Sequence, residues 1–305
     1  MEEEEPAAKR AKLSDGGIVK SLLRKQKPDK KSVMVSVETF TLVQHQGIEG
    51  DNSKNEQSPR QVLLVDADKL ADLLTPEQLS ANIVVSGTFD GCTLQQLPSG
   101  TVLEDAKGSV RLRVTFECEP CATVWSRIDK ETQDQVKKES NMKNFEALQP
   151  YRGILATVIE GGELALGACL RVSSSSKPPY AALAEGAIQR CLDLVSRIPR
   201  GLLAECGEVV TRAGAPSGLA RGLPGMLARR RAEDDAPSLF RVVNRDGRLP
   251  GTSAEQHKKQ VSALEAEGHK VSGAGTKESP FKVERFEDVR WRPTHQELFL
   301  QSAQS

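Results

Sequence analysis

The chain has no long hydrophobic segment and no excess of charge of either sign. No apolar run approaches the ~20 residues that a membrane-spanning helix needs, and the acidic start carries no secretory signal. Lysine and arginine number 42 against 42 aspartate and glutamate, which excludes a strongly basic or acidic protein. We therefore expect an intracellular globular protein without a membrane partner. Its 305 residues exceed the usual size of a single core and predict two domains.

Cysteine is too sparse for a disulfide framework. The six cysteines of an intracellular chain indicate metal binding, sulfur chemistry or core packing. Only Cys118 and Cys121 have the C-x-x-C spacing, and no second pair is present to complete a zinc ribbon. A structural zinc site is therefore not expected.

A short basic cluster lies near the start of the chain, at residues 6–15. Its string Pro-Ala-Ala-Lys-Arg-x-Lys-Leu resembles a monopartite nuclear localisation signal, in a segment too polar to fold alone. Residues 1–16 are accordingly expected to form a disordered tail that directs the chain to the nucleus, with the cytoplasm as a further location. An ordinary charged tail is the alternative.

The hydrophobic pattern divides the remaining chain into two parts. The first part has short β-branched runs, which predict a barrel or closed sandwich, at residues 33–37, 62–65, 82–85, 110–114, 153–159 and 168–172. Helical spacing interrupts them at residues 66–79, and residues 129–144 form a polar excursion, either helix or loop. Serine and proline make residues 173–180 a linker. Helical spacing follows from Ala184 to Val195, and residues 294–305 form a tail.

Several short motifs in the first part follow one another in a recognisable order. They are Gly47-Ile48-Glu49-Gly50-Asp51, Arg60-Gln61-Val62, Asn82-Ile83-Val84-Val85-Ser86-Gly87, Pro120-Cys121, and Arg152-Gly153 with Glu160-Gly161-Gly162-Glu163. This succession resembles the MOSC domain, the β-barrel named after the C-terminal domain of molybdenum-cofactor sulfurase, over residues 17–172. The resemblance implies a mainly-β barrel as the fold of this domain.

The resemblance also implies a chemistry for the first domain. Cys121 stands where the family has its functional cysteine, as catalytic residue and metal ligand, and thiolate is both the nucleophile and the soft ligand. Arg60, Asn82, Arg152 and Cys118 are the candidate cofactor-binding residues, since guanidinium groups match anionic oxygens. The implied cofactor is molybdenum cofactor or persulfide sulfur from a cysteine desulfurase-type donor. Pyridoxal phosphate is implied only through a sulfurase partner.

The first domain also departs from the family pattern. Cys118 replaces an arginine, and Glu117 and Glu119 disfavour a thiolate at Cys121, so this cysteine is either functional or an inert relic. Cys118 and Cys121 as a redox or resolving pair is a third possibility. For Arg60 and Asn82, the alternative is that they brace the barrel.

The second part carries eleven arginines and no lysine between Arg190 and Arg248, and residues 176–305 have 20 basic against 16 acidic residues. Its motifs resemble the alkyltransferase-like proteins, which share the DNA-binding winged helix-turn-helix of the alkylguanine-DNA alkyltransferases. The motifs are Ile198-Pro199, Gly207, Ala213-Gly214-Ala215-Pro216, Ala220-Arg221, Arg241-Val242-Val243-Asn244, Leu264-Glu265-Ala266-Glu267-Gly268 and Arg290-Trp291-Arg292-Pro293. The resemblance covers residues 181–293 and implies a mainly-α winged helix-turn-helix.

This second resemblance implies that the domain binds duplex DNA with alkylated guanine and acts with repair-pathway proteins. Arg221 stands at the position of an arginine finger that fills the gap left by an extruded nucleotide, and the small residues Ala220 and Gly222 allow close approach. Leu239 and Phe240 are expected to wall an apolar pocket that Arg241 orders. The family's reactive cysteine and histidine are absent from this stretch, so no alkyl transfer is expected.

Other departures leave the function of the second domain open. Cys206 replaces a tyrosine of the family, and Pro224 lies inside the expected recognition helix, where proline costs ~3 kcal/mol. One hypothesis is recognition of DNA lesions without repair. The alternative is a sulfur-carrier or molybdenum enzyme with a degenerate C-terminal scaffold, and the third is a scaffold with two inactive domains.

Overall fold

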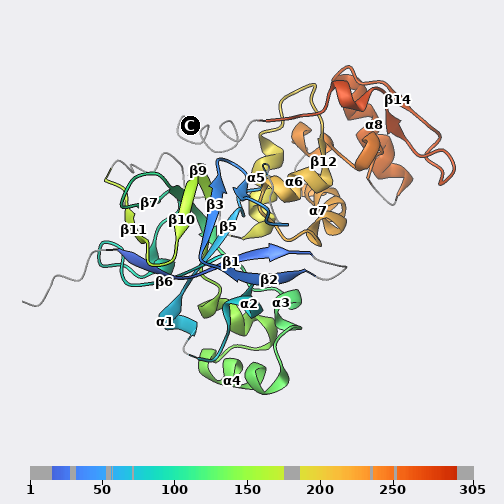
Figure 1. Ribbon diagram of the computed structural model, residues 1–305. Helices are drawn as coiled ribbons and strands as arrows, with labels where there is room; N and C mark the ends of the chain where they lie inside the picture. Colours follow the sequence, from blue (N-terminus) through green and yellow to red (C-terminus); the bar gives the residue numbers. More distant parts are fainter. Residues whose placement is uncertain are drawn as a thin grey trace, which may run out of the picture. The chain divides into compact units, whose positions relative to one another are not determined.

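The computed structural model describes residues 16–27, 32–52, 56, 58–70, 72–174, 186–233, 236–250 and 253–293. The chain divides into two compact units, Met1–Lys54 with Val62–Pro178 and Asn55–Gln61 with Pro179–Ser305 (Figure 1). The predicted nuclear signal, most of the predicted linker and the predicted C-terminal tail lie outside the described residues. Within the described residues, no helix has the length and apolar character needed to cross a membrane.

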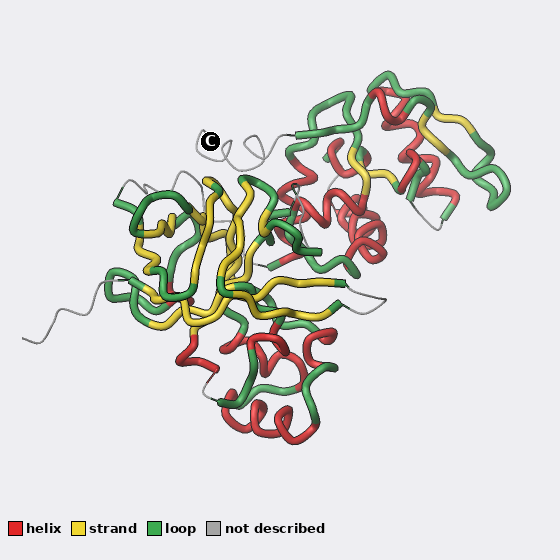
Figure 2. The backbone as a smooth tube through the Cα atoms, in the orientation of Figure 1, coloured by secondary structure: helices red, strands yellow, loops and turns green. Residues whose placement is uncertain are grey.

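The first unit is built on a closed β-barrel (Figure 2). Its sheet has the order β11-β7-β8-β9-β5-β6-β1-β2, and β11 also pairs with β1, so that seven of the described strands close a ring while β2 pairs with β1 outside it. The ring strands are β1 (Gly17–Gln26), β5 (Val62–Asp66), β6 (Ile83–Ser86), β7 (Val102–Asp105), β8 (Arg111–Glu117), β9 (Ile154–Glu160) and β11 (Cys169–Val172). The barrel predicted from the β-branched runs is therefore confirmed.

Alternating apolar residues fill the interior of the barrel. Val62 and Leu64 of β5 and Leu112 and Val114 of β8 are at most 1% exposed and belong to one hydrophobic cluster, as expected when every second residue of a strand points inward. Gly153 immediately precedes β9 and has a φ of +68°, and a Cβ atom there would lie 2.0 Å from the Leu64 carbonyl oxygen. Only glycine therefore lets the two strands approach at this point.

Each of the six predicted β-branched runs overlaps a strand, including β2 (Val33–Val37). Further strands were not predicted: β1, β7, and the three-stranded sheet of β3 (Thr39–Val43), β4 (Gly47–Ile48) and β10 (Gly162–Ala165). Strand β1 carries Lys20, Arg24 and Lys25, which interrupt its apolar pattern. Its second half, Leu22–Gln26, pairs with β2. Strand β1 is therefore held by pairing with other strands, which a local sequence pattern does not reveal.

Helices occupy the connections between barrel strands. The parallel pair β5 and β6 requires a crossover, formed by α1 (Ala67–Leu70) and α2 (Pro76–Leu79) within the stretch of predicted helical spacing. Between β8 and β9 lie α3 (Ala122–Trp125), α4 (Lys130–Ser140) and the 3-10 helix η2 (Asn144–Tyr151). The polar excursion is thus largely helical, and Asp129 caps α4 by accepting from Thr132 N at 2.9 Å.

The second unit is mainly helical, as predicted. Its helices are α5 (Ala187–Ser196), α6 (Cys206–Arg212), α7 (Leu219–Glu233) and α8 (Ala254–Ala266), with the 3-10 helices η3 (Pro237–Phe240), η4 (Arg245–Gly247) and η5 (Phe286–Asp288). Two small sheets pair β12 (Ala204–Glu205) with β13 (Val242–Val243) and β14 (Val271–Ser272) with β15 (Lys282–Val283). The helix pair α6–α7 and a two-stranded sheet are present, and the assignment of a winged helix stays a prediction.

Candidate functional sites

The thiol of Cys121 lies at the start of α3. Its sulfur accepts from Val124 N at 3.4 Å, and the residue is half-buried. The preceding Pro120 restricts the backbone as the chain leaves β8. The structure therefore places the predicted functional cysteine in a fixed setting that retains some exposure to solvent.

The guanidinium of Arg152 lies against the other cysteine of the pair. Its Nη2 is 2.9 Å from the sulfur of Cys118, while Nη1 donates to the Leu79 carbonyl at 2.6 Å and Nε donates to the Glu119 carbonyl at 3.4 Å. Cys118 is 1% exposed and Arg152 is 4% exposed. The cation that the sequence lacks before Cys121 is thus supplied by Arg152, between η2 and β9, and it contacts Cys118.

Cys118 and Cys121 form the predicted resolving pair. Both cysteines are free in the described structure, and residues 118–121 connect β8 to α3. A disulfide requires about 4.4–6.8 Å between the two Cα atoms. The role of Cys118 and Cys121 as a redox or resolving pair therefore stays a prediction.

Asn82 braces strands β1 and β5 of the barrel and the loop at Asp51. Its Oδ1 accepts from Leu63 N at 3.0 Å, and its Nδ2 donates to the Leu23 carbonyl at 3.3 Å and to Asp51 Oδ2 at 3.5 Å. Both polar ends of the amide are used inside the fold. This geometry accounts for the asparagine as a brace, which was the alternative interpretation of its role.

Arg60 belongs to the second unit, although the resemblance placed it in the barrel domain. The contacts of the chain assign residues 55–61 to this unit, and Arg60 Nη1 donates to the Gly214 carbonyl at 2.9 Å. Its guanidinium is therefore committed to a backbone acceptor next to α6. The domain bounds given by the sequence motifs stay a prediction.

These contacts decide how well the predicted residues fit an anionic molybdenum cofactor. The guanidinium groups of Arg60 and Arg152 and the amide of Asn82 all donate to internal acceptors. Within the described residues, no three His, Cys, Asp or Glu side chains gather as a metal site. The donor set therefore does not fit this cofactor as arranged, and the roles of Cys121 as metal ligand and of its neighbours in cofactor binding stay predictions.

The outward face of α7 carries arginines separated by glycines. Arg221, Gly225 and Arg229 follow at intervals of four, with Gly222 beside them, and all four are exposed. No atom lies within 4 Å of a Cβ built on either glycine. The opposite face carries Leu223 and Leu227, which are at most 1% exposed. The helix thus presents two cations and a bare stretch of backbone to solvent, and it runs through Pro224.

The residues predicted to wall a pocket are buried. Leu239 is 6% exposed and packs into the main hydrophobic cluster of the unit, and Phe240 is 8% exposed. Ala220 is partly buried and packs against the same cluster. A base that contacts Leu239 and Phe240 would require these side chains to move, so their DNA-binding role stays a prediction.

Arg241 forms a partly buried ion pair with Glu267. Its Nη2 lies 2.7 Å from Glu267 Oε1, and Nη1 donates to the Ile198 carbonyl at 2.6 Å. Burial opposes the charge of Glu267, but hydrogen bonds from Arg241 and from Gly201 N outweigh it and hold the pKa of this carboxyl below its ordinary value. Arg241 therefore holds Glu267 and the Ile198 carbonyl inside the unit, while its ordering of a base pocket and its contact with DNA stay predictions.

Neither cysteine of the second unit exposes its thiol. These two residues, Cys191 and Cys206, are 0% and 5% exposed. Burial raises the pKa of Cys191 to about 11, against a smaller opposing effect of Arg190. The thiolate needed for attack on an alkyl group is therefore disfavoured at Cys191, and neither sulfur faces solvent.

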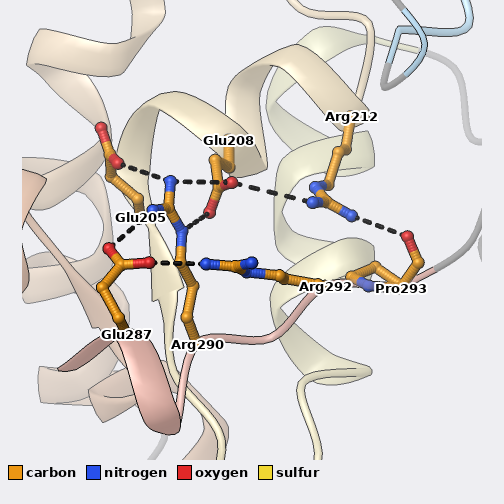
Figure 3. Close-up of polar contacts among 7 residues, drawn as sticks. All are labelled: Glu205, Glu208, Arg212, Glu287, Arg290, Arg292 and Pro293. Carbon is orange, nitrogen blue, oxygen red and sulfur yellow. Dashed lines mark hydrogen bonds and ion pairs between the residues drawn. The ribbon is translucent and has the colours of Figure 1, made fainter. Parts of the chain in front are cut away.

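A network of ion pairs ties the end of the described chain to α6. Arg290 is its centre, bonded to Glu208 at 3.0 Å and to Glu287 at 2.8 Å. Figure 3 shows the seven residues involved: Glu205, Glu208, Arg212, Glu287, Arg290, Arg292 and Pro293. A pocket of about 610 Å³ opens beside the network. Arg290 pairs with the three glutamates that line this pocket, Glu205, Glu208 and Glu287. We therefore interpret the network as structural, because it holds the end of the described chain against α6.

The comparisons with known proteins begin with the family model. Residues 54–171 match the model of the MOSC domain. The chain contains a MOSC domain. No curated protein matches the chain.

Among solved structures, the YUAD protein from Bacillus subtilis is 22% identical, with 50% of this chain and 93% of that chain covered and a TM-score of 0.41. Atl1 of S. pombe, in complex with damaged DNA containing O6-carboxymethylguanine, is 23% identical, with 35% and 94% covered and a TM-score of 0.30. YiiM from Escherichia coli is 13% identical, with 81% and 92% covered and a TM-score of 0.33. These TM-scores are too low to establish the fold or function of either unit.

Proposed function

We propose that the second unit binds duplex DNA through the outward face of α7 and transfers no alkyl group. The observation that carries this proposal is the exposed row of Arg221, Gly225 and Arg229 with Gly222 beside it. Arg221 and Arg229 are eight residues apart, about 12 Å along the helix, and guanidinium groups pair well with phosphate oxygens. The glycines between them leave the backbone uncovered, so the helix axis approaches a groove more closely than a helix with side chains there.

The finer proposal is that the unit recognises alkylated guanine and that Arg221 enters the base stack in place of an extruded nucleotide. The exposure of Arg221 supports this part. The buried state of Leu239 and Phe240 requires that the pocket opens on binding. A nuclear location and cooperation with repair-pathway proteins follow from this function and remain proposals.

Fluorescence anisotropy with a labelled duplex tests DNA binding. We expect Arg221→Met to weaken binding about tenfold, as removal of a contact worth about 1.4 kcal/mol does. Gly225→Leu, which changes no charge, should weaken binding similarly because it covers the backbone. Arg171→Met, at an exposed arginine of β11, is the matched control for loss of one charge. Equal affinity of all four proteins would disprove the role of α7.

The same assay tests the finer proposal. A duplex with one O6-methylguanine should bind more tightly to the unaltered chain than the same duplex with guanine. The preference should disappear in Arg221→Met if this side chain occupies the vacated stack. Equal affinity for the two duplexes would leave general DNA binding and remove lesion recognition.

A second candidate function is acceptance of sulfane sulfur by Cys121, favoured by its half-buried thiol at the start of α3. The thiolate would attack the terminal sulfur of a donor persulfide, such as that of a cysteine desulfurase, so that one S–S bond forms as another breaks and the donor leaves as a thiolate. Persulfide labelling should decrease in Cys121→Ser and persist in Cys92→Ser, a half-buried control. Unchanged labelling of Cys121→Ser would exclude this function.

A further inference from the structure

Helix α6 ends in a motif that leaves backbone carbonyls to be satisfied from outside the helix. Ala215 N donates to the Val210 carbonyl at 2.9 Å and Gly214 N donates to the Thr211 carbonyl at 3.0 Å. Gly214 has a φ of +59°. This is the Schellman pattern, in which a left-handed glycine terminates the helix. The chain then turns and enters α7 at Leu219.

Two arginines satisfy the carbonyls of this turn. Arg190 of α5, which is 5% exposed, donates from Nε to the Ala213 carbonyl at 2.8 Å and from Nη2 to the Gly214 carbonyl at 3.3 Å. Arg60 donates from Nη1 to the same Gly214 carbonyl at 2.9 Å. A carbonyl oxygen has two lone pairs and accepts both bonds. The Gly214 carbonyl is thus held from two sides.

The two arginines come from distant parts of the sequence. Arg190 lies on the helix that precedes α6, whereas Arg60 lies in residues 55–61, which precede the first unit's strand β5 and yet belong to the second unit. Both flanking alanines, Ala213 and Ala215, are at most 7% exposed.

We infer that Arg60 is a positioning residue that fixes the turn between α6 and α7, and so sets the direction in which α7 presents its arginines. The effect on DNA binding rests on the proposed function of α7, whereas the contact between Arg60 and the Gly214 carbonyl does not depend on it. Residues 181–293 alone therefore form an incomplete DNA-binding unit. One of the two guanidinium groups that hold the turn belongs to Arg60, which precedes strand β5 in the sequence.

The test uses the full chain with Arg60→Met, which keeps the aliphatic length and removes the donor. Hydrogen exchange of the backbone amides in residues 209–219 should accelerate about fivefold or more, while exchange in β8 stays unchanged. Arg60→Lys, which retains a charge and N–H donors on one nitrogen, should restore most of the protection even if Arg60→Met unfolds. Arg171→Met, in the barrel, should alter neither segment. Unchanged exchange in residues 209–219 of Arg60→Met would overturn the inference.

Duplex affinity measured at several salt concentrations separates positioning from direct contact. We expect Arg60→Met to bind about fivefold more weakly, with the salt dependence of the unaltered chain. Loss of a phosphate contact would instead lower the slope of log affinity against log salt by about 0.9, and that result would refute a positioning role. If the unaltered chain binds no duplex but exchange still accelerates, the DNA-binding proposal fails while the positioning of the turn stands. If the unaltered chain binds duplex but Arg60→Met changes neither the hydrogen exchange nor the affinity, the positioning role of Arg60 fails while the DNA-binding proposal stands.

Discussion

Arg152 of the first unit and helix α7 of the second unit use arginine in opposite ways. In the first unit, Arg152 is 4% exposed and each of its three donor groups contacts a partner inside the barrel unit. In the second unit, Arg221 and Arg229 of α7 are exposed on a face that carries two glycines. A buried guanidinium with satisfied donors holds the fold, whereas an exposed row of guanidinium groups can bind an anion. Burial, and not the presence of arginine, therefore separates the arginines that hold the fold from those that we propose to bind DNA.

The largest effect is expected for Arg152→Met. The substitution leaves the Leu79 and Glu119 carbonyls without the donors that they have at 2.6 and 3.4 Å, and it removes the cation from Cys118. Loss of these buried charged hydrogen bonds should lower the free energy of unfolding by about 3–5 kcal/mol. Denaturant unfolding monitored in the first unit measures it, and Arg171→Met should change stability by less than about 0.5 kcal/mol. A small loss in Arg152→Met would contradict its structural role.

An intermediate effect is expected for Glu267→Gln in the second unit. Gln keeps the shape but removes the charge that pairs with Arg241 at 2.7 Å. Because both side chains are largely buried, the free energy of unfolding should fall by about 2–3 kcal/mol. Glu265→Gln, at an exposed neighbour on α8, is the control. Equal stability of the two variants would show that the ion pair contributes nothing net.

The sequence predicted the architecture better than the roles of individual residues. The β-branched runs located six strands because alternate burial leaves a local pattern, and the helical spacing after the linker located α5. Strand β1 was missed because Lys20, Arg24 and Lys25 break its pattern. Motif order identified the MOSC domain, which the family model confirms.

The sites depend on contacts that are distant in sequence. Arg152 and Cys118 are 34 residues apart and Arg60 and Gly214 are 154 apart, and no local spacing encodes such pairs. Asn82 likewise has a side-chain amide of the kind that binds ligands, but this amide donates to the backbone of β1. The exposed row of α7 was partly visible, since the arginines and glycines alternate at helical spacing. The missed signal was the left-handed glycine motif at Gly214, which marks the end of α6.

The smallest effect concerns one histidine in each unit. Burial lowers the pKa of His45, and the nearby charge of Arg113 lowers it further. Burial also lowers the pKa of His269, against a smaller opposing effect of Glu267. Each histidine therefore binds a proton more weakly in the folded chain than in the unfolded chain, where its pKa is about 6.5. The stability that each contributes is present above pH 6.5 and is lost as the pH falls through the lowered folded pKa.

Unfolding measured between about pH 7.5 and pH 5 should show this loss in both units, because groups that take up protons on unfolding make the folded state less stable as the pH falls. His45→Gln should flatten the pH dependence of the first unit alone, and His269→Gln that of the second unit alone. His257→Gln, at a partly exposed histidine of α8, controls for the substitution. If both variants kept the full pH dependence, carboxylates such as Glu267 would have to account for it, and those act at lower pH because the pKa of Glu267 lies below its ordinary value.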